Sequence, residues 1–298
     1  MNPLSDREFS RYRRLIYDTA GIHLGPAKKA LLEARLGRRL RELGMESFSA
    51  YYDYVMADAT GEELIDLLDR ISTNETHFFR EPRQFEFLAT RLLPRWTEQA
   101  ERGARPRRIR IWSAGCSTGE EPYSLAMLLL DYFPPSRGWH LEIIGTDLSH
   151  RAIAAAEKSV WPLAKAKEIP TNYLKRFMLE GFGSQEGFMK AGPEIRSIVR
   201  FHRLNLNDER YGIAASFDLI FCRNVMIYFD TLARGRVLDR LLDCLAPEGY
   251  LFVGHAESLS GLSDRLSHIA PTVYALAPAE GLPADRAAGQ PREASVIQ

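Results

Sequence analysis

The chain has 298 residues, 45% of them hydrophobic, and its 39 Lys and Arg balance 39 Asp and Glu, so its formal net charge is zero. This length suits a large core and two domains, and the zero charge excludes an overall field that would attract nucleic acid or an anionic membrane. No apolar run is long enough to span a bilayer, and the N-terminus lacks the apolar core of a signal peptide. We therefore expect a cytoplasmic protein with no nucleic-acid partner and no membrane insertion.

Residues 1–71 are expected to form an all-helical N-terminal domain. Apolar residues recur there at three- and four-residue steps, which is the pattern of amphipathic helices. The helices are expected in four segments, namely 8–19, 31–43, around 51–55 and 62–71. Gly44 follows the second segment and is expected to end it.

The second of these segments also carries a run of basic residues. Lys28, Lys29, Arg35, Arg38 and Arg39 lie on or beside it, and its leucines form the other face. The pattern alone leaves two interpretations open, a solvated helix face and a surface that binds an acidic partner. A nucleic-acid surface is not expected, because aromatic residues are not interleaved with the basic ones.

Residues 72–108 are expected to link this domain to the next one. They contain the stretch STNETHFFREPRQF, a helix over about 84–99 and the polar segment ERGARPRR. A sheet is expected to begin directly after them.

The most informative segment is 109–129, which predicts a buried strand, a loop of small residues and a helix. Gly115 and Gly119 are separated by three residues, which fits neither the GxGxxG fingerprint of dinucleotide sites nor a P-loop. Glycine also lets a ligand approach the backbone closely. Glu120 and Glu121 open the helix, and two carboxylates there would repel a pyrophosphate. A ligand with hydroxyl groups, an amine and a sulfonium fits better, and S-adenosylmethionine (SAM) is such a ligand.

The following strand, over about 141–145, ends close to Asp147. An acid at the carboxyl end of the second strand can accept hydrogen bonds from two ribose hydroxyls, in a SAM site as in a NAD site. Two structural alternatives stay open: Asp147 caps the next helix, or Glu120 and Glu121 only complement a helix dipole. Taken together, the loop, the paired acids and Asp147 favour a SAM site.

The rest of the chain continues an alternation of strands and helices that predicts parallel βαβ units. Residues 159–200 interrupt it with a glycine-bearing stretch and are expected to be an inserted β-subdomain. Further elements are expected at 198–203, 217–222, 231–245, 250–253 and 272–276. The tail 278–298 is rich in Ala, Pro, Gly and charge and is expected to be disordered. The cysteines and histidines show no metal-ligand spacing, so we expect no metal.

Four motifs resemble the chemotaxis receptor methyltransferases (CheR family): RISTNETHFFREPRQF, SAGCSTGEEPYSLA, FCRNVMIYF and GYLFVGHAESL. The resemblance runs from about residue 8 to residue 277. It implies an α/β fold, in which a Rossmann-like SAM-dependent methyltransferase domain over 109–277 carries a small inserted antiparallel β-subdomain and follows the helical domain. It also implies methyl transfer from SAM to glutamate side chains of chemoreceptors, with S-adenosylhomocysteine as the product.

The resemblance further implies roles for individual residues. Arg80 and Tyr228 are implied to lie nearest the transferred methyl, and the linker helix to line the active site. With the loop residues above, the cofactor-binding set is expected to be Asn74, Thr76, Arg80, Gly115, Glu121, Asp147, Asn205, Leu206, Arg223 and Asn224. Simpler roles stay open, namely a surface pair of Arg80 with Glu81, a core aromatic at Tyr228, and caps or turns at Asn74 and Thr76.

For the partner, the resemblance implies a methyl-accepting chemoreceptor whose acidic helices bind the basic residues between Lys28 and Arg39. In some members of the family the inserted subdomain also binds a short tether at the receptor's C-terminus as an added edge strand. We expect a monomer. Two other functions stay open: a SAM-binding regulatory module without turnover, and a methyltransferase that acts on a small molecule or RNA.

Overall fold

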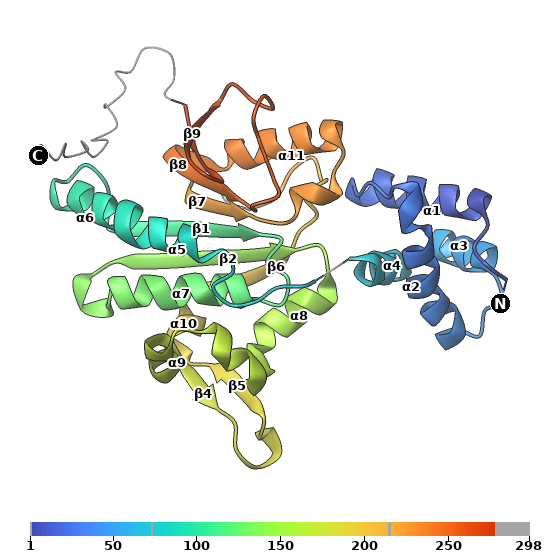
Figure 1. Ribbon diagram of the computed structural model, residues 1–298, viewed down its shortest axis with the longest axis horizontal. Coiled ribbons are helices and arrows are strands. Elements are labelled where there is room, and N and C mark those ends of the chain that lie inside the picture. Colours follow the sequence, from blue (N-terminus) through green and yellow to red (C-terminus); the bar gives the residue numbers. More distant parts are fainter. Residues whose placement is uncertain (1, 73, 214–215, 278–298) are drawn as a thin grey trace, which may run out of the picture.

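A computed structural model of the chain describes residues 2–72, 74–213 and 216–277. These residues form two parts, a small helical part and a larger α/β part built on a sheet (Figure 1). The tail that the sequence predicts to be disordered, 278–298, lies outside the described residues. No helix in the described ranges is long and apolar enough to cross a membrane.

The helical part contains the four helices expected from the sequence. Ser5 begins the first with a capping box, because its hydroxyl accepts from the Glu8 backbone N–H while the Glu8 carboxylate accepts from Ser5 N. The apolar stripes of the four helices meet in one core that includes Tyr12, Leu36 and Leu67. The bounds are α1 Asp6–Ala20, η1 Pro26–Lys28, α2 Lys29–Glu42, α3 Phe48–Ala57 and α4 Glu62–Ile71.

The α/β part is built on a seven-stranded sheet in the order β6-β2-β1-β7-β8-β10-β9. The first five strands in this order are parallel. β10 is antiparallel to both of its neighbours, β8 and the edge strand β9, so the sheet is mixed. The bounds are β1 Arg108–Ala114, β2 His140–Asp147, β6 Val199–Arg203, β7 Phe217–Cys222, β8 Leu245–Val253, β9 Leu266–Ala270 and β10 Val273–Leu276.

Two features of this sheet differ from the sequence prediction. β9 has no counterpart among the predicted strands, because it lies on the outer edge and none of its residues is fully buried. β8 begins at Leu245 and not at the predicted residue 250. Leu245 already pairs with β7, and residues 246–249 form an irregularity within the strand, where the register between β8 and β7 shifts.

Both faces of the sheet are buried, because side chains of β1 alternate between two cores. Ile109 and Ile111 face a core shared with α5, α6 and α7, whereas Trp112 and Ala114 face a core shared with α11. The predicted helix 84–99 is extended at both ends and is interrupted by one π-helical turn, η2. The bounds are α5 Pro82–Phe87, η2 Leu88–Leu92, α6 Leu93–Glu101, α7 Glu120–Tyr132, η3 Pro135–Arg137, α8 His150–Lys158, η6 Met226–Tyr228 and α11 Thr231–Asp243.

The segment between α8 and β6 carries a second, three-stranded antiparallel sheet in the order β3-β5-β4. In Figure 1 it extends away from the main sheet. This is the small inserted β-subdomain that the sequence predicts, although helical turns make up much of it. The bounds are β3 Val160–Pro162, η4 Leu163–Glu168, α9 Thr171–Phe177, β4 Met178–Glu180, η5 Gly183–Gln185, β5 Phe188–Ala191 and α10 Pro193–Ser197.

Candidate functional site

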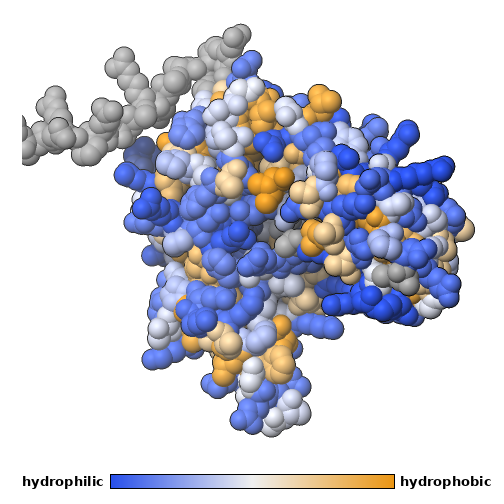
Figure 2. All heavy atoms as spheres, turned by 45° about the vertical axis from the view of Figure 1, so that its right-hand side comes forward, coloured by the Kyte–Doolittle hydropathy of each residue, from blue (hydrophilic) through white to orange (hydrophobic). Residues whose placement is uncertain are grey.

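A cavity of about 300 Å³ lies at the carboxyl ends of β1, β2 and β7, beside the helical part. Figure 2 looks onto the side where the two parts meet, and both hydrophobic and hydrophilic residues lie around the hollow there. The carboxyl edge of a parallel sheet is where ligands of open α/β folds bind. Every residue predicted for the cofactor or for catalysis lines this cavity, namely Asn74, Thr76, Arg80, Gly115, Glu121, Asp147, Asn205, Leu206, Arg223, Asn224 and Tyr228.

The loop after β1 is held in shape by its neighbours. Gly115 has a φ of 82°, and a Cβ on it would lie 2.3 Å from Cγ2 of Val225, so glycine is required by packing. A Cβ on Gly119 would likewise lie 2.9 Å from Cβ of Ala156. The two glycines therefore make room for protein neighbours, and not only for a ligand as the sequence suggests.

Asp147 ends β2 with its carboxylate between two backbone donors. Ser117 N donates to Oδ2 at 2.8 Å, and Ser149 N donates to Oδ1 at 2.9 Å. Burial raises the pKa of Asp147 above its ordinary value, against the opposing effect of these hydrogen bonds. The side-chain cap of α8 is Ser149, whose hydroxyl accepts from Ala152 N at 3.1 Å. Ser149, and not Asp147, is therefore the side-chain cap of α8.

Glu121 and Arg223 form a buried ion pair under the cavity. Arg223 Nε donates to Glu121 Oε2 at 2.6 Å, and the two side chains are 2% and 11% exposed, Arg223 being the less exposed. Arg223 Nη1 also donates to the Arg80 carbonyl at 2.6 Å and to Gln84 Oε1 at 3.1 Å. The charge of Arg223 is therefore already neutralised inside the protein, and this residue is not a free cation that could steer an acidic substrate.

Glu120 lies on the opposite side of the α7 N-terminus and is fully buried. Its carboxylate accepts from Lys165 Nζ at 2.5 Å and from the Thr118 hydroxyl at 2.6 Å. Lys165 also donates to the Thr76 carbonyl at 3.0 Å. Lys165, in η4 of the insertion, therefore joins the cofactor loop to the segment that carries Arg80. Lys165 is not among the predicted site residues, because no local sequence pattern marks it.

The segment that carries Arg80 is constrained at several points. Phe79 and Glu81 have positive φ values of 51° and 59°. Phe78 N donates to Glu168 Oε2, and Phe79 N donates to the Ser124 hydroxyl, both at 3.0 Å.

Arg80 itself is half-buried at the cavity wall. Its Nη1 donates to the Glu75 carbonyl at 3.1 Å, and among the described residues it forms no ion pair. Glu81 instead lies 3.7 Å from Arg223 Nη1 and accepts from His255 N. The alternative of a surface pair between Arg80 and Glu81 is therefore wrong.

The loop after β7 depends on Glu257, a buried residue of the GYLFVGHAESL motif. Its carboxylate accepts from Asn224 N at 2.7 Å, Gly254 N at 2.6 Å and Ile227 N at 3.3 Å. Burial raises the pKa of this carboxyl group. Glu257 is not among the predicted site residues, although its place in the GYLFVGHAESL motif is a usable signal.

Main-chain contacts join the cavity loops to the helical part. His23 N donates to the Tyr228 carbonyl at 2.7 Å, and Ile22 and Phe229 form an antiparallel bridge. Asn205 Nδ2 donates to the Thr19 carbonyl at 2.7 Å. The amide of Asn205 is thus used in holding α1, so this residue presents its remaining surface to the cavity.

The basic residues predicted to bind a partner divide into two groups. Lys28 and Arg38 are exposed, and Lys28 lines the cavity. The other three side chains have partners within the protein: Lys29 pairs with Asp6, Arg35 donates to carbonyls at the end of α4, and Arg39 pairs with Glu63. Arg35 and Arg39 therefore do not form a solvent-facing basic surface, which corrects the prediction for these two residues.

Comparisons with known proteins show what the chain is similar to. Residues 74–275 match the family model "CheR methyltransferase, SAM binding domain", and residues 7–72 match "CheR methyltransferase, all-alpha domain". The "Chemotaxis protein methyltransferase" of Borreliella burgdorferi is 38% identical over 268 residues, which cover 90% of this chain and 93% of that protein. The protein of the same name from Salmonella typhimurium is 38% identical over 274 residues, covering 92% and 91%.

Proposed function

The chain belongs to the CheR methyltransferase family, and we propose that it transfers the methyl group of SAM to glutamate side chains of bacterial chemoreceptors in the cytoplasm, as a monomer. The products are glutamate methyl esters and S-adenosylhomocysteine. The observation that carries the proposal is that residues from distant motifs meet in one cavity beside the helical part.

The residues of the cavity fit SAM. Asp147 accepts one backbone N–H on each oxygen, so each oxygen has lone-pair capacity left for a ribose hydroxyl. Leu206 offers apolar surface to the adenine. Arg80 and Glu121 would face the charged amino-acid end. The set that we assign to the cofactor is completed by Asn74, Thr76, Gly115, Asn205, Arg223 and Asn224.

The chemistry requires orientation more than proton transfer. When bound, SAM supplies an activated methyl group on a sulfonium. A glutamate carboxylate is already ionised near pH 7, so the protein needs no general base. Arg80, which has no acidic partner among the described residues, attracts the carboxylate into the cavity. The Tyr228 hydroxyl holds one carboxylate oxygen and leaves the other free to attack.

Two surfaces are proposed for the receptor. Lys28 at the cavity mouth and Arg38 on α2 face solvent and favour an acidic receptor helix. On the insertion, β4 is an edge strand, and Leu179 and Phe182 nearby are 53% and 89% exposed. An extended receptor tether can add to this edge and cover these apolar side chains.

The test is transfer of radiolabelled methyl from SAM to membranes that contain the host's chemoreceptors. We expect label that is released as methanol in mild base, as glutamate methyl esters require. A matched reaction with Asp147→Ala should transfer much less label at limiting SAM. Tight SAM binding without any base-labile label would contradict the proposal and favour a SAM-binding module without turnover or a different acceptor.

A further inference from the structure

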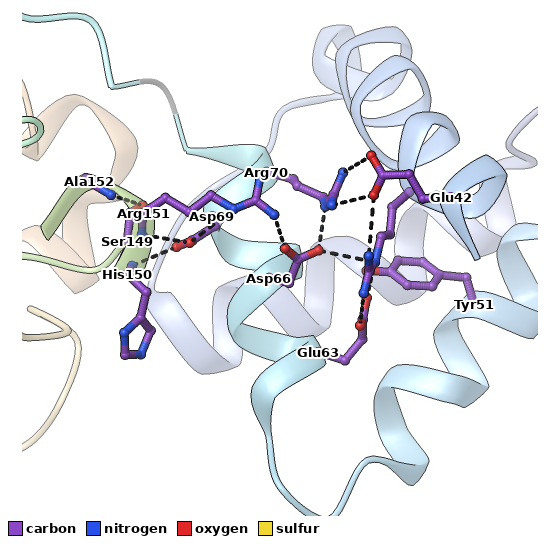
Figure 3. Close-up of polar contacts among 11 residues, drawn as sticks. Glu42, Tyr51, Glu63, Asp66, Asp69, Arg70, Ser149, His150, Arg151 and Ala152 are labelled. Carbon is purple, nitrogen blue, oxygen red and sulfur yellow. Dashed lines mark hydrogen bonds and ion pairs between the residues drawn. The ribbon is translucent and has the colours of Figure 1, made fainter. Parts of the chain in front are cut away.

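One of the contacts between the helical part and the α/β part is made by a buried carboxylate, that of Asp69. Asp69, near the end of α4, points its side chain at the N-terminus of α8 (Figure 3). Its Oδ1 accepts from His150 N at 3.1 Å and its Oδ2 accepts from Arg151 N at 3.2 Å. The Asp69 side chain is 3% exposed. A carboxylate from one part of the molecule thus binds the first helical N–H groups of the other part.

A network of charged side chains holds Asp69 in this place. Asp66 pairs with Arg70 of the same helix and with Arg151 of α8. The network continues into the helical core through four further contacts, shown in part in Figure 3: Arg70 with Glu42, Arg39 with Asp66, Arg39 with Glu63, and the Tyr51 hydroxyl with Glu63. α4 is therefore fixed on both sides, toward α2 and toward α8.

The acids of this network outnumber its guanidinium groups. The acids are Glu42, Glu63, Asp66 and Asp69, and the guanidinium groups are those of Arg39, Arg70 and Arg151. The α8 N-terminus, with its exposed N–H groups, supplies the remaining positive potential that Asp69 requires.

The N-terminus of α8 also holds the carboxylate of Asp147, the residue that we assign to the ribose of the cofactor. Ser149 N donates to Asp147 Oδ1 at 2.9 Å, and the next two N–H groups, of His150 and Arg151, donate to Asp69. Three consecutive backbone donors are therefore shared between Asp147 in the cavity and Asp69 in the helical part. A displacement of α4 that moves this turn also moves the donor that orients Asp147.

We propose that Asp69 is a positioning residue for the SAM site: it fixes the α8 N-terminus and, through it, the carboxylate of Asp147. It follows that the position of the helical part and the affinity for SAM are coupled, and by linkage the coupling is reciprocal. This inference rests on the proposed function in one point, the assignment of Asp147 to the ribose.

The test is a double-mutant cycle with S-adenosylhomocysteine binding measured by calorimetry on the full chain. We expect Asp69→Asn to weaken binding ~tenfold, because one amide N–H₂ group would then oppose a backbone donor. In an Asp147→Ala background the same change should have almost no further effect, because Asp69 acts through Asp147. Additive losses, or a single Asp69→Asn variant that binds like the wild type, would overturn the proposal.

Arg151→Gln is the matched control. It removes the ion pair with Asp66 and the long, 3.9 Å contact of Arg151 Nε with Asp69 Oδ2, but keeps the Arg151 backbone donor to Asp69, and the Arg151 side chain is 59% exposed. We expect its affinity for S-adenosylhomocysteine to stay within about twofold of the wild type. A loss equal to that of Asp69→Asn would show that the interface as a whole matters, and would overturn the specific role of Asp69.

A second measurement uses only the wild-type protein and so does not depend on whether a variant folds. Hydrogen exchange of the wild type is compared with and without S-adenosylhomocysteine, and we expect added protection in residues 62–69 of α4, which do not line the cavity. Unchanged exchange there would overturn the coupling. If Asp147→Ala binds S-adenosylhomocysteine as tightly as the wild type, the Asp147 assignment of the proposed function fails; if only Asp69→Asn does so, the positioning role alone fails.

Discussion

The floor and the rim of the cavity hold their side chains in different ways. On the floor, Asp147, Glu121 and Arg223 each make at least two hydrogen bonds to the protein. On the rim, Leu31 and Ile227 are 37% and 48% exposed, and Lys28 is exposed as well. A floor that is already organised suits a small ligand of fixed shape, whereas an open, apolar and basic rim suits a large partner. Variants of the two regions should therefore fail in different ways.

The largest effect is expected from breaking the buried pair on the floor. Glu121→Leu leaves the Arg223 guanidinium, 2% exposed, without its nearest counter-charge. We expect a loss of about 3 to 5 kcal/mol in the free energy of unfolding, measured by urea denaturation. The control is Glu98→Gln, which removes an exposed pair with Arg102 and should cost less than about 1 kcal/mol. Equal losses would contradict the assignment of Glu121 to the buried scaffold.

Asp147→Ala should weaken cofactor binding on the floor and leave the rim of the cavity unaffected. Loss of a charged acceptor for the ribose is expected to cost about 2 to 3 kcal/mol of SAM affinity, with a nearly unchanged kcat at saturating SAM. Calorimetry and steady-state kinetics measure the two quantities. The control is Asp131→Ala on α7, which removes an exposed ion pair with Arg176 of α9. It should leave SAM affinity and kcat unchanged.

Acidification should reproduce the loss of Asp147. Burial raises the pKa of this group, so the ionised form that accepts ribose hydroxyls is complete above the raised pKa and is lost as the pH falls through it. We expect the affinity for S-adenosylhomocysteine to fall as the pH is lowered, starting at a higher pH than it would for an exposed aspartate. Asp147→Ala should have a flatter profile, and identical profiles would refute this explanation.

Lys165→Met tests how the insertion supports the floor. It removes the cation that joins buried Glu120 to the Thr76 carbonyl. We expect a loss of about 1 to 3 kcal/mol in stability and a roughly tenfold lower kcat/KM, both partly restored by Lys165→Arg. Lys167→Met, at an exposed residue of the same turn, is the matched control. Equal behaviour of the two Met variants would exclude a specific role for Lys165.

The smallest effect is expected from Tyr228→Phe, where floor and rim meet. The hydroxyl orients a carboxylate that is already ionised, so its loss should lower kcat only about two- to tenfold and leave SAM affinity unchanged. Single-turnover methyl transfer measures the first quantity and calorimetry the second. Complete loss of turnover with normal SAM affinity would mean that Tyr228 has a larger part in the chemistry than orientation.

The sequence predicts the floor better than the supports beneath it. Gly115, Glu121 and Asp147 follow predicted strands, and parallel strands end at one edge, so their meeting in one cavity follows from the pattern. Lys165, Glu257 and Asp69 act on residues far away in the chain, and no local period records such contacts. The sequence likewise does not reveal that Arg39 points into the protein, because its partner Glu63 lies on another helix.

The fold is predicted where apolar periodicity is strong. The four helices of the helical part and the parallel strands follow directly from it. Edge strand β9 and the register break in β8 depend on neighbouring strands, so the chain's own pattern does not reveal them.

The seam between the two parts has an evolutionary consequence. At α1 and the segment after it, the helical part contributes main-chain atoms: the Thr19 carbonyl, His23 N and the backbone bridge at Ile22. Main-chain contacts survive most substitutions, because every residue type except proline presents the same donor and acceptor. The outward side chains of α1 can therefore change while the seam stays closed, whereas the contact of Asp69 with α8 depends on one particular side chain.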